Sequence, residues 1–168
     1  MILHLYGHMD RNMVRKGDRV KKYETLIGTV GNGNGQYWAH LHFAISDGLS
    51  VDELVKYVGG WSKEKVERYY KNPKGIEFNK MFGFNIDVGN MGYDFLQKVP
   101  GIGFHPGVDV NGYSGGNSDM GYEFKSSCDG EVVYELRTWF KNKGWGNIAI
   151  VREDEKVECN HKCPKHCK

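Results

Sequence analysis

The chain lacks the features that mark three common classes of protein. Its 23 basic and 21 acidic residues leave a net charge of +2, which is too small to indicate a nucleic-acid-binding protein. No apolar run approaches the roughly 20 residues of a membrane-spanning helix. The opening Met-Ile-Leu-His lacks the basic start and the apolar core of a signal peptide. We therefore expect no nucleic-acid partner and no membrane span, and the chain shows no secretion signal.

Length and composition favour a single β-rich domain. A chain of 168 residues can bury most of the surface of one core, with little left for a second. The 23 glycines and the 13% of aromatic residues favour turn-rich β structure. The sequence contains no internal repeat and no low-complexity tract.

Two histidines lie two positions apart in a strand-like segment. His40-Leu-His42 falls inside an alternating run, residues 39–45. Strand residues two apart point to the same face, about 6.6–6.8 Å apart along the chain. The pattern therefore predicts two imidazoles side by side on a rigid element.

A second string, His105-Pro-Gly-Val-Asp109, offers an imidazole and a carboxylate four residues apart. Pro106 and Gly107 exclude a regular helix between them. Two histidines and one aspartate form the donor set of a catalytic Zn²⁺ site, which keeps its fourth position open for water. One histidine is then left over for proton chemistry.

These strings resemble the lysostaphin-type (LytM-like) zinc endopeptidases, which cleave the peptide part of bacterial peptidoglycan. That family has a His-x-x-x-Asp pair, a Tyr-x-His and a closing His-x-His. Here they are His105 with Asp109, Tyr6-Gly7-His8, and His40 with His42. The framing strands are similar as well, over roughly residues 1–58 and 100–154. Together the three motifs are specific, although each alone is weak.

The resemblance implies an all-β fold, an antiparallel β-sandwich of the type called the duplicated hybrid motif. It also implies a Zn²⁺ ion held by His105, Asp109 and His42, with His40 and His8 as catalytic residues. The alternative for His40 is a structural hydrogen bond to the backbone.

Two further residues have weaker connections to this site. A loop tyrosine holds the substrate carbonyl in relatives, and Tyr93 is the candidate here, with plain surface packing as the alternative. Strand alternation places His4, Tyr6 and His8 on one face, so His4 would border the pocket. The family gives His4 no role, and we expect it to be structural.

The two halves of the motif set stand in reversed order. In the family the His-x-x-x-Asp half comes first, whereas here the His-x-His half opens the chain. One interpretation is a circular permutant, divided at a surface hairpin where chain ends are tolerated. Another is a segment that joins the end of one such domain to the start of the next. We expect a permutant that is a monomer or a swapped homodimer, with residues 147–152 paired antiparallel to residues 2–8.

The permuted domain divides into four parts, with a short helical insert joining its halves. The His-x-His half covers residues 1–58, a partly helical linker 59–104, the His-x-x-x-Asp half 105–154, and a Cys/His-rich tail 155–168. A capping box at Ser50 and Glu53 predicts a helix to about residue 58, and Ser62 predicts another over 63–71. Expected strands cover residues 2–8, 26–31, 38–46, 107–111, 122–126, 130–137 and 147–152.

The tail gathers three cysteines and two histidines, Cys159, His161, Cys163, His166 and Cys167. They fit a structural zinc knuckle, or disulfides in an exported protein that include Cys128, or a disordered basic tail.

The sequence thus predicts a zinc endopeptidase acting on the stem or cross-bridge of peptidoglycan, for lysis or remodelling of the cell wall, with a phage lysin as one form. We expect it outside the cell, in the cell wall or on a phage particle. The alternative is a non-catalytic module that is a structural part or an activator in cell-wall or phage-tail machinery.

Overall fold

The computed structural model describes residues 1–56, 61–137 and 145–155. Its strands are β1 (Ile2–Asn12), β2 (Arg19–Val20), β3 (Leu26–Val30), β4 (Leu41–Asp47), β5 (Tyr70–Lys71), β6 (Asp87–Val88), β7 (Lys98–Val99), β8 (Gly103–Phe104), β9 (Val108–Asn111), β10 (Glu123–Lys125), β11 (Gly130–Leu136) and β12 (Asn147–Glu153). The helices are α1 (Val51–Lys56), α2 (Lys63–Tyr69), the 3-10 turn η1 (Pro73–Gly75) and α3 (Phe78–Phe82).

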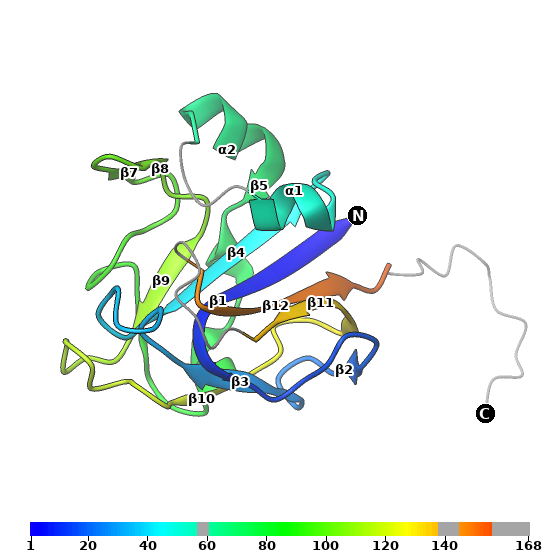
Figure 1. Cartoon of the computed structure of the whole chain (residues 1–168), viewed down its shortest axis with the longest axis horizontal. Helices are drawn as coiled ribbons and strands as arrows, with labels where there is room; N and C mark the ends of the chain where they lie inside the picture. Colours follow the sequence, from blue (N-terminus) through cyan, green and yellow to red (C-terminus); the bar gives the residue numbers. More distant parts are fainter. Residues whose placement is uncertain (57–60, 138–144, 156–168) are drawn as a thin grey trace, which may run out of the picture.

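One ten-stranded antiparallel sheet dominates the molecule (Figure 1). Its main path runs β2-β11-β12-β1-β4-β9-β6. β3 pairs with the far end of β1 and continues the sheet to β10, while β5 adds to β4. A small hairpin, β7-β8, stands apart. The predicted all-β class is confirmed.

The strand pairing that a circular permutation requires, between the first and the last predicted strands, is present within one chain. β1 and β12 run antiparallel, with Leu3 opposite Arg152 and Tyr6 opposite Ala149. This is the pairing predicted for residues 2–8 and 147–152. A circular permutant should also have Met1 close to Lys168, but Lys168 lies outside the described residues.

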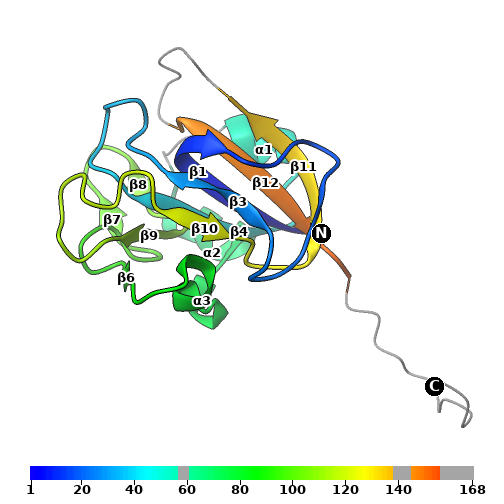
Figure 2. The same cartoon turned by 90° about the horizontal axis from the view of Figure 1, so that it is seen from below.

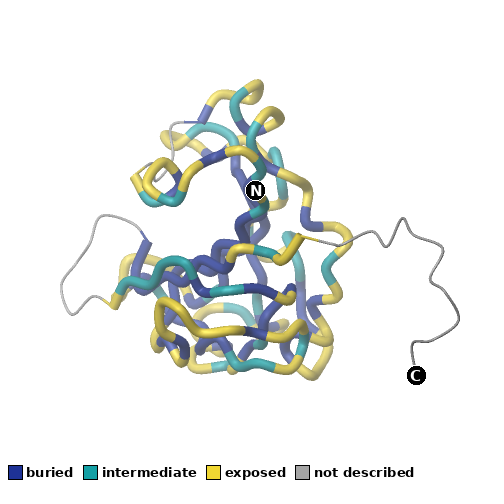
Figure 3. Tube along the Cα trace, turned by 90° about the vertical axis from the view of Figure 1, so that its right-hand side faces the viewer, coloured by how far each residue is buried: buried dark blue, intermediate teal, exposed yellow. Residues whose placement is uncertain are grey.

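Two hydrophobic cores lie on the two faces of the central strands. The larger core fills the space between β1 and β4 on one side and β3 and β10 on the other (Figure 2). It contains Tyr6, Met9, Ile27, Phe43, Val108 and Phe124. The smaller core lies under α1 and α2 and contains Leu3, Leu5, Ala44, Leu54, Val66 and Ile150. Alternation along β1 and β4 thus sends successive side chains to different cores. Buried residues follow the central strands, and exposed ones lie in the outer turns and helices (Figure 3).

The helix signals mark real helices, with changes at their ends. The side chains of Ser50 and Glu53 bond each other's backbone N–H groups at the start of α1. The Ser62 hydroxyl accepts from the Lys65 N–H at the start of α2. The expected end of the first helix near residue 58 lies outside the described residues.

Two boundaries were predicted wrongly, and one helix was missed. α2 ends at Tyr69 rather than residue 71, because Tyr70 and Lys71 turn extended and pair with β4 as β5. β4 begins at Leu41 rather than 38, so His40 lies before it, in an isolated bridge to Gly31. α3 was not expected at all. In the described part of the chain, no helix is long and apolar enough to cross a bilayer.

Candidate active site

Two predicted metal ligands face each other across neighbouring strands. His42 on β4 and Asp109 on β9 are direct antiparallel partners. Ahead of β9, Gly107 passes so close to β4 that a Cβ atom there would lie 2.2 Å from the carbonyl oxygen of Phe43. Only glycine permits this approach, which carries His105 to the other two residues. His42, His105 and Asp109 therefore come together, and all three are buried.

Three atoms of these residues converge. His105 Nε2 lies 2.9 Å from His42 Nδ1, and Asp109 Oδ1 lies 3.3 Å from the first nitrogen and 3.4 Å from the second. In a tetrahedral zinc site with bonds of about 2.0–2.1 Å, neighbouring ligand atoms are about 3.3–3.4 Å apart. The three atoms are thus spaced like one face of such a site, with the two nitrogens slightly closer together.

Backbone groups orient two of the three side chains. His105 Nδ1 lies 3.3 Å from the Asp94 carbonyl oxygen, which can only accept. That nitrogen therefore carries the ring proton, and Nε2 presents a lone pair to the site. On Asp109, Oδ2 accepts a hydrogen bond of 2.9 Å from the Tyr93 N–H, which leaves Oδ1 facing the histidines. His42 Nε2 is buried without a partner among the described residues.

The protonation states suit a cation. Burial would raise the pKa of the Asp109 carboxyl, but the adjacent imidazoles of His105 and His42 outweigh it and hold the pKa well below its usual range. Burial lowers the pKa of His42 to about 4. At neutral pH the site therefore offers a carboxylate and a neutral imidazole, the forms in which these groups bind metal.

His8 reaches the site through an irregularity in β1. The pairing register of β1 shifts between Tyr6 and Met9, and His8 has φ +61°, which is uncommon for a residue with a side chain. Its backbone N–H donates to the Trp145 carbonyl oxygen at 2.8 Å. The His8 ring then lies beside those of His40 and His42, with centroids 4.7 and 5.8 Å away. Burial, followed by the neighbouring imidazoles, lowers the pKa of His8 well below 6.5.

His40 lies at the mouth of the same cluster. Its Nδ1 is 2.7 Å from the Trp38 carbonyl oxygen, so this nitrogen donates and Nε2 faces inward. Nε2 lies 3.7 Å from Asp109 Oδ1. The hydrogen bond to the backbone that was considered as the alternative role of His40 is therefore present, and it aims the ring at the ligand carboxylate.

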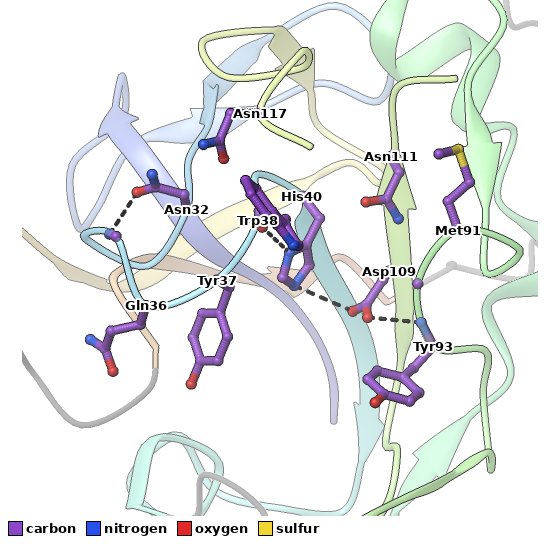
Figure 4. Close-up of a pocket in the computed structure, with 12 residues that line it drawn as sticks. Asn32, Gln36, Tyr37, Trp38, His40, Met91, Tyr93, Asp109, Asn111 and Asn117 are labelled. Carbon is purple, nitrogen blue, oxygen red and sulfur yellow. Dashed lines mark hydrogen bonds and ion pairs between the residues drawn. The ribbon is translucent and has the colours of Figure 1, made fainter. Parts of the chain in front are cut away.

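An open cleft of about 600 Å³ leads to His40 and Asp109. One wall is the segment from Asn32 to Trp38, and the other carries Met91, Gly92 and Tyr93 (Figure 4). The cleft ends on residues that sequence reasoning singled out, His40 and Asp109.

Comparison with known families gives a match over the first part of the chain. Residues 1–53 match Peptidase family M23. The matched stretch carries His8, His40 and His42, and M23 enzymes are metallopeptidases. His105 and Asp109 lie beyond it. No curated protein and no solved structure matched the chain.

The remaining predicted residues have different positions. Tyr93 lines the cleft and is 37% exposed; its ring centroid lies 5.9 Å from that of His105, and its backbone N–H donates to Asp109 Oδ2. Cys128 is buried. The proposed second site lies outside the described residues: Cys159, His161, Cys163, His166 and Cys167.

Strand alternation suggested that His4 borders the pocket, but in the structure it does not. Its Nδ1 bonds the Ser127 hydroxyl at 2.6 Å, and its Nε2 faces Glu153 at 3.3 Å. Its ring contacts Phe43 of the larger core. The alternation argument failed because the irregularity at His8 breaks the period, and His4 has the structural role that was expected of it.

Sequence reasoning missed Trp145 as a component of the site. Its ring packs on His42 and His8, with centroids 5.2 and 6.1 Å away, and covers them from the side of the smaller core. Gly7 permits this packing, since a Cβ there would lie 3.2 Å from the indole. The string Gly144-Trp-Gly146 was visible as a framing motif, but nothing in it signalled contact with the histidines.

Proposed function

We propose that the protein is a zinc-dependent endopeptidase that hydrolyses peptide bonds in the stem or cross-bridge of bacterial peptidoglycan. The observation that carries the proposal is the convergence of His105 Nε2, His42 Nδ1 and Asp109 Oδ1 on one point at the end of an open cleft. The M23 match over residues 1–53 supports the peptidase assignment. Its place of action would be the cell wall, outside the cell or from a phage particle.

The chemistry of the donor set fits zinc. Nδ1 of His42 offers a second lone pair when the ring proton is on Nε2, and in that tautomer two nitrogen lone pairs and a carboxylate within 2.9–3.4 Å would repel one another without a cation between them. Borderline nitrogen donors with one carboxylate favour Zn²⁺ over Mg²⁺ or Ca²⁺, which prefer oxygen ligands. When bound, the ion supplies a Lewis acid and a water molecule whose pKa is near 7.

The two remaining histidines supply donors and proton transfer. His40 Nε2 lies 3.7 Å from Asp109 Oδ1 at the cleft, where it would take part in proton transfer at a bound peptide group. The His8 ring lies beside that of His40, is oriented by the Trp145 carbonyl oxygen, and would offer a second imidazole. Trp145 and Tyr37 shield His8 from solvent on two sides, which strengthens its hydrogen bonds.

The chain order is proposed to be a circular permutation of the family order. Support comes from the antiparallel pairing of β1 with β12 inside one chain, which joins the two ends of the described sequence at one sheet position. The three ligands also come from this single chain, so a monomer contains a complete site.

Metal analysis combined with wall hydrolysis tests the proposal. Protein purified without chelator should contain about one Zn²⁺ per chain and reduce the turbidity of a peptidoglycan suspension, and a chelator should abolish both. Release of new amino groups from the wall would identify cleavage of peptide bonds. If the protein binds one Zn²⁺ per chain but hydrolyses none of several cell walls that differ in the type of cross-linking bond, the result would instead support the non-catalytic module.

A further inference from the structure

Trp38 is the most exposed of the large hydrophobic side chains in the described part of the chain, at 72%. A single exposed tryptophan is not remarkable in itself. Its position is informative, because it stands on the rim of the cleft, two residues before His40 (Figure 4). Its own carbonyl oxygen holds His40 Nδ1 at 2.7 Å. The indole is therefore tied by its backbone to the proposed catalytic residues.

Both neighbours of Trp38 are held in place, which holds the backbone from which the indole projects. Tyr37 packs on His8 with ring centroids 4.9 Å apart. Ala39 is buried, and its N–H donates to Asn117 Oδ1 at 2.9 Å. Trp38 is thus left to project into the open cleft. A rigid aromatic side chain on a fixed backbone offers a contact surface at low cost in conformational entropy.

The rest of the lining is polar and almost uncharged. Carboxamides line the cleft around the indole, namely Asn32, Gln36, Asn111 and Asn117. Among the lining residues there is no lysine or arginine, so a ligand carboxylate would find no cation here. Carboxamides donate and accept equally, which suits hydroxyl and acetamido groups. A flat apolar face beside such groups matches a pyranose ring, whose C–H face stacks on an indole.

We propose that Trp38 forms a subsite for an N-acetylated amino sugar of the glycan strand. The inference rests on the proposed peptidase function and narrows its substrate: the peptide is cleaved while still attached to glycan, and the sugar stacked on Trp38 helps to place the scissile bond at His40. A peptide side chain seated on the indole is the competing occupant.

A pair of matched substrates tests this subsite. One is a soluble glycan chain that carries cross-linked peptides, and the other is the same cross-linked peptide released from its sugar. Wild-type protein should show a kcat/KM at least about tenfold higher for the first. Trp38→Ala should bring the ratio of the two kcat/KM values close to one, and Trp38→Phe should keep most of it. Met13→Ala is the control, because Met13 is exposed and lies outside the cleft, and this variant should not change the ratio. Equal loss on both substrates in Trp38→Ala would identify a peptide side chain as the occupant and overturn the proposal.

A binding measurement separates failure of the subsite from failure of the peptidase function. Titration calorimetry with a trimer of β-1,4-linked N-acetylglucosamine should detect binding to wild-type protein and to Met13→Ala, but not to Trp38→Ala. Sugar binding of this pattern without any peptide hydrolysis would retain the subsite and reject the peptidase. Hydrolysis without a glycan preference and without sugar binding would reject the subsite alone.

Discussion

His4 and His8 lie four residues apart on β1, and their side chains occupy opposite faces of the sheet. His4 contacts Phe43 in the larger core, whereas His8 lies beside His42 and Trp145. Regular alternation would place both on one face. The positive φ of His8, with the register shift that follows Tyr6, turns the second ring into the site. Backbone strain of this kind is common at functional positions.

Replacing Gly146 should disturb catalysis without removing metal. A Cβ atom at Gly146 would lie 3.2 Å from the Cα of Gly33 and 3.3 Å from the Cα of His8, so Gly146→Ala would push His8 out of place. Displacements of about 1 Å can cost about a hundredfold in rate. We expect at least a tenfold loss of hydrolysis with zinc content unchanged.

The matched control for this substitution is Gly121→Ala. Gly121 also has a positive φ, +83°, but open space at its Cβ position. Both variants should lose about 1 kcal/mol of unfolding free energy from the backbone conformation alone. Similar activity losses in the two variants would mean that His8 placement has no part in catalysis.

Removing a ligand should remove the metal. His42→Ala and Asp109→Ala each leave two donors of the convergent set, and the zinc content measured after dialysis against a weak chelator should fall close to zero. Asp119→Asn is the control, because Asp119 is a buried carboxyl that accepts from the Gly112 N–H and does not belong to the set. Full zinc occupancy in both ligand variants would refute the ligand assignment.

Removing His40 should separate metal binding from catalysis. His40→Ala should retain zinc and lose hydrolysis by about 10²–10³, the usual effect of removing one donor to the transition state. His8→Ala should behave in the same way with a smaller loss. If either variant hydrolyses walls at the wild-type rate with zinc bound, that histidine has only a structural role.

The metal-free protein should lose stability as the pH falls from about 6.5 towards 5. Burial lowers the pKa of His4 below 6.5, although Glu153 partly opposes the shift. The folded state therefore binds fewer protons than the unfolded state below pH 6.5, and stability is full above that pH and declines on acidification. Burial also lowers the pKa values of His8 and His42, so they add to the slope.

Denaturant titrations with chelator present, at several pH values, should show this slope and a weaker one in His4→Gln. In that variant the contributions of His8 and His42 remain while that of His4 is gone. An equal slope in the two proteins would show that His4 binds its proton as readily when folded as when unfolded.

Solution mass tests the proposed chain order. Because β1 pairs with β12 inside one chain, light scattering should give the mass of a single chain, with full zinc and activity at all dilutions. If the protein is a dimer in solution, and dilution removes both the dimer and the activity, the swapped arrangement would be favoured. In that arrangement halves of two chains share each site.

Sequence predicted the elements whose signals are local. The helix starts at Ser50 and Ser62 were found because capping is decided within four residues. The sequence also predicted that His42 and Asp109 come together, because the His-x-His and His-x-x-x-Asp motifs are read locally.

The parts that sequence missed depend on distant contacts. Alternation along β1 placed His4 on the same face as His8, because the irregularity at His8 depends on Trp145 and Gly146, far along the chain. The hydrogen bond from Tyr93 to Asp109 comes from a backbone N–H, which every residue except proline has, so no side-chain pattern could indicate it.

The interior position of β1 has a consequence for how the protein is made. β1 precedes the other described strands in the sequence, and it lies between β4 and β12 in the sheet. During synthesis β4 is made soon after β1 and can pair with one edge of it. The other edge of β1, where Tyr6 lies opposite Ala149, stays unpaired until β12 has been made. Pairing across such a separation is slow, and an open strand edge in the waiting chain invites contacts with other chains. Chaperone dependence and low yield at high expression rates are therefore expected of this topology, and slower translation should improve the yield.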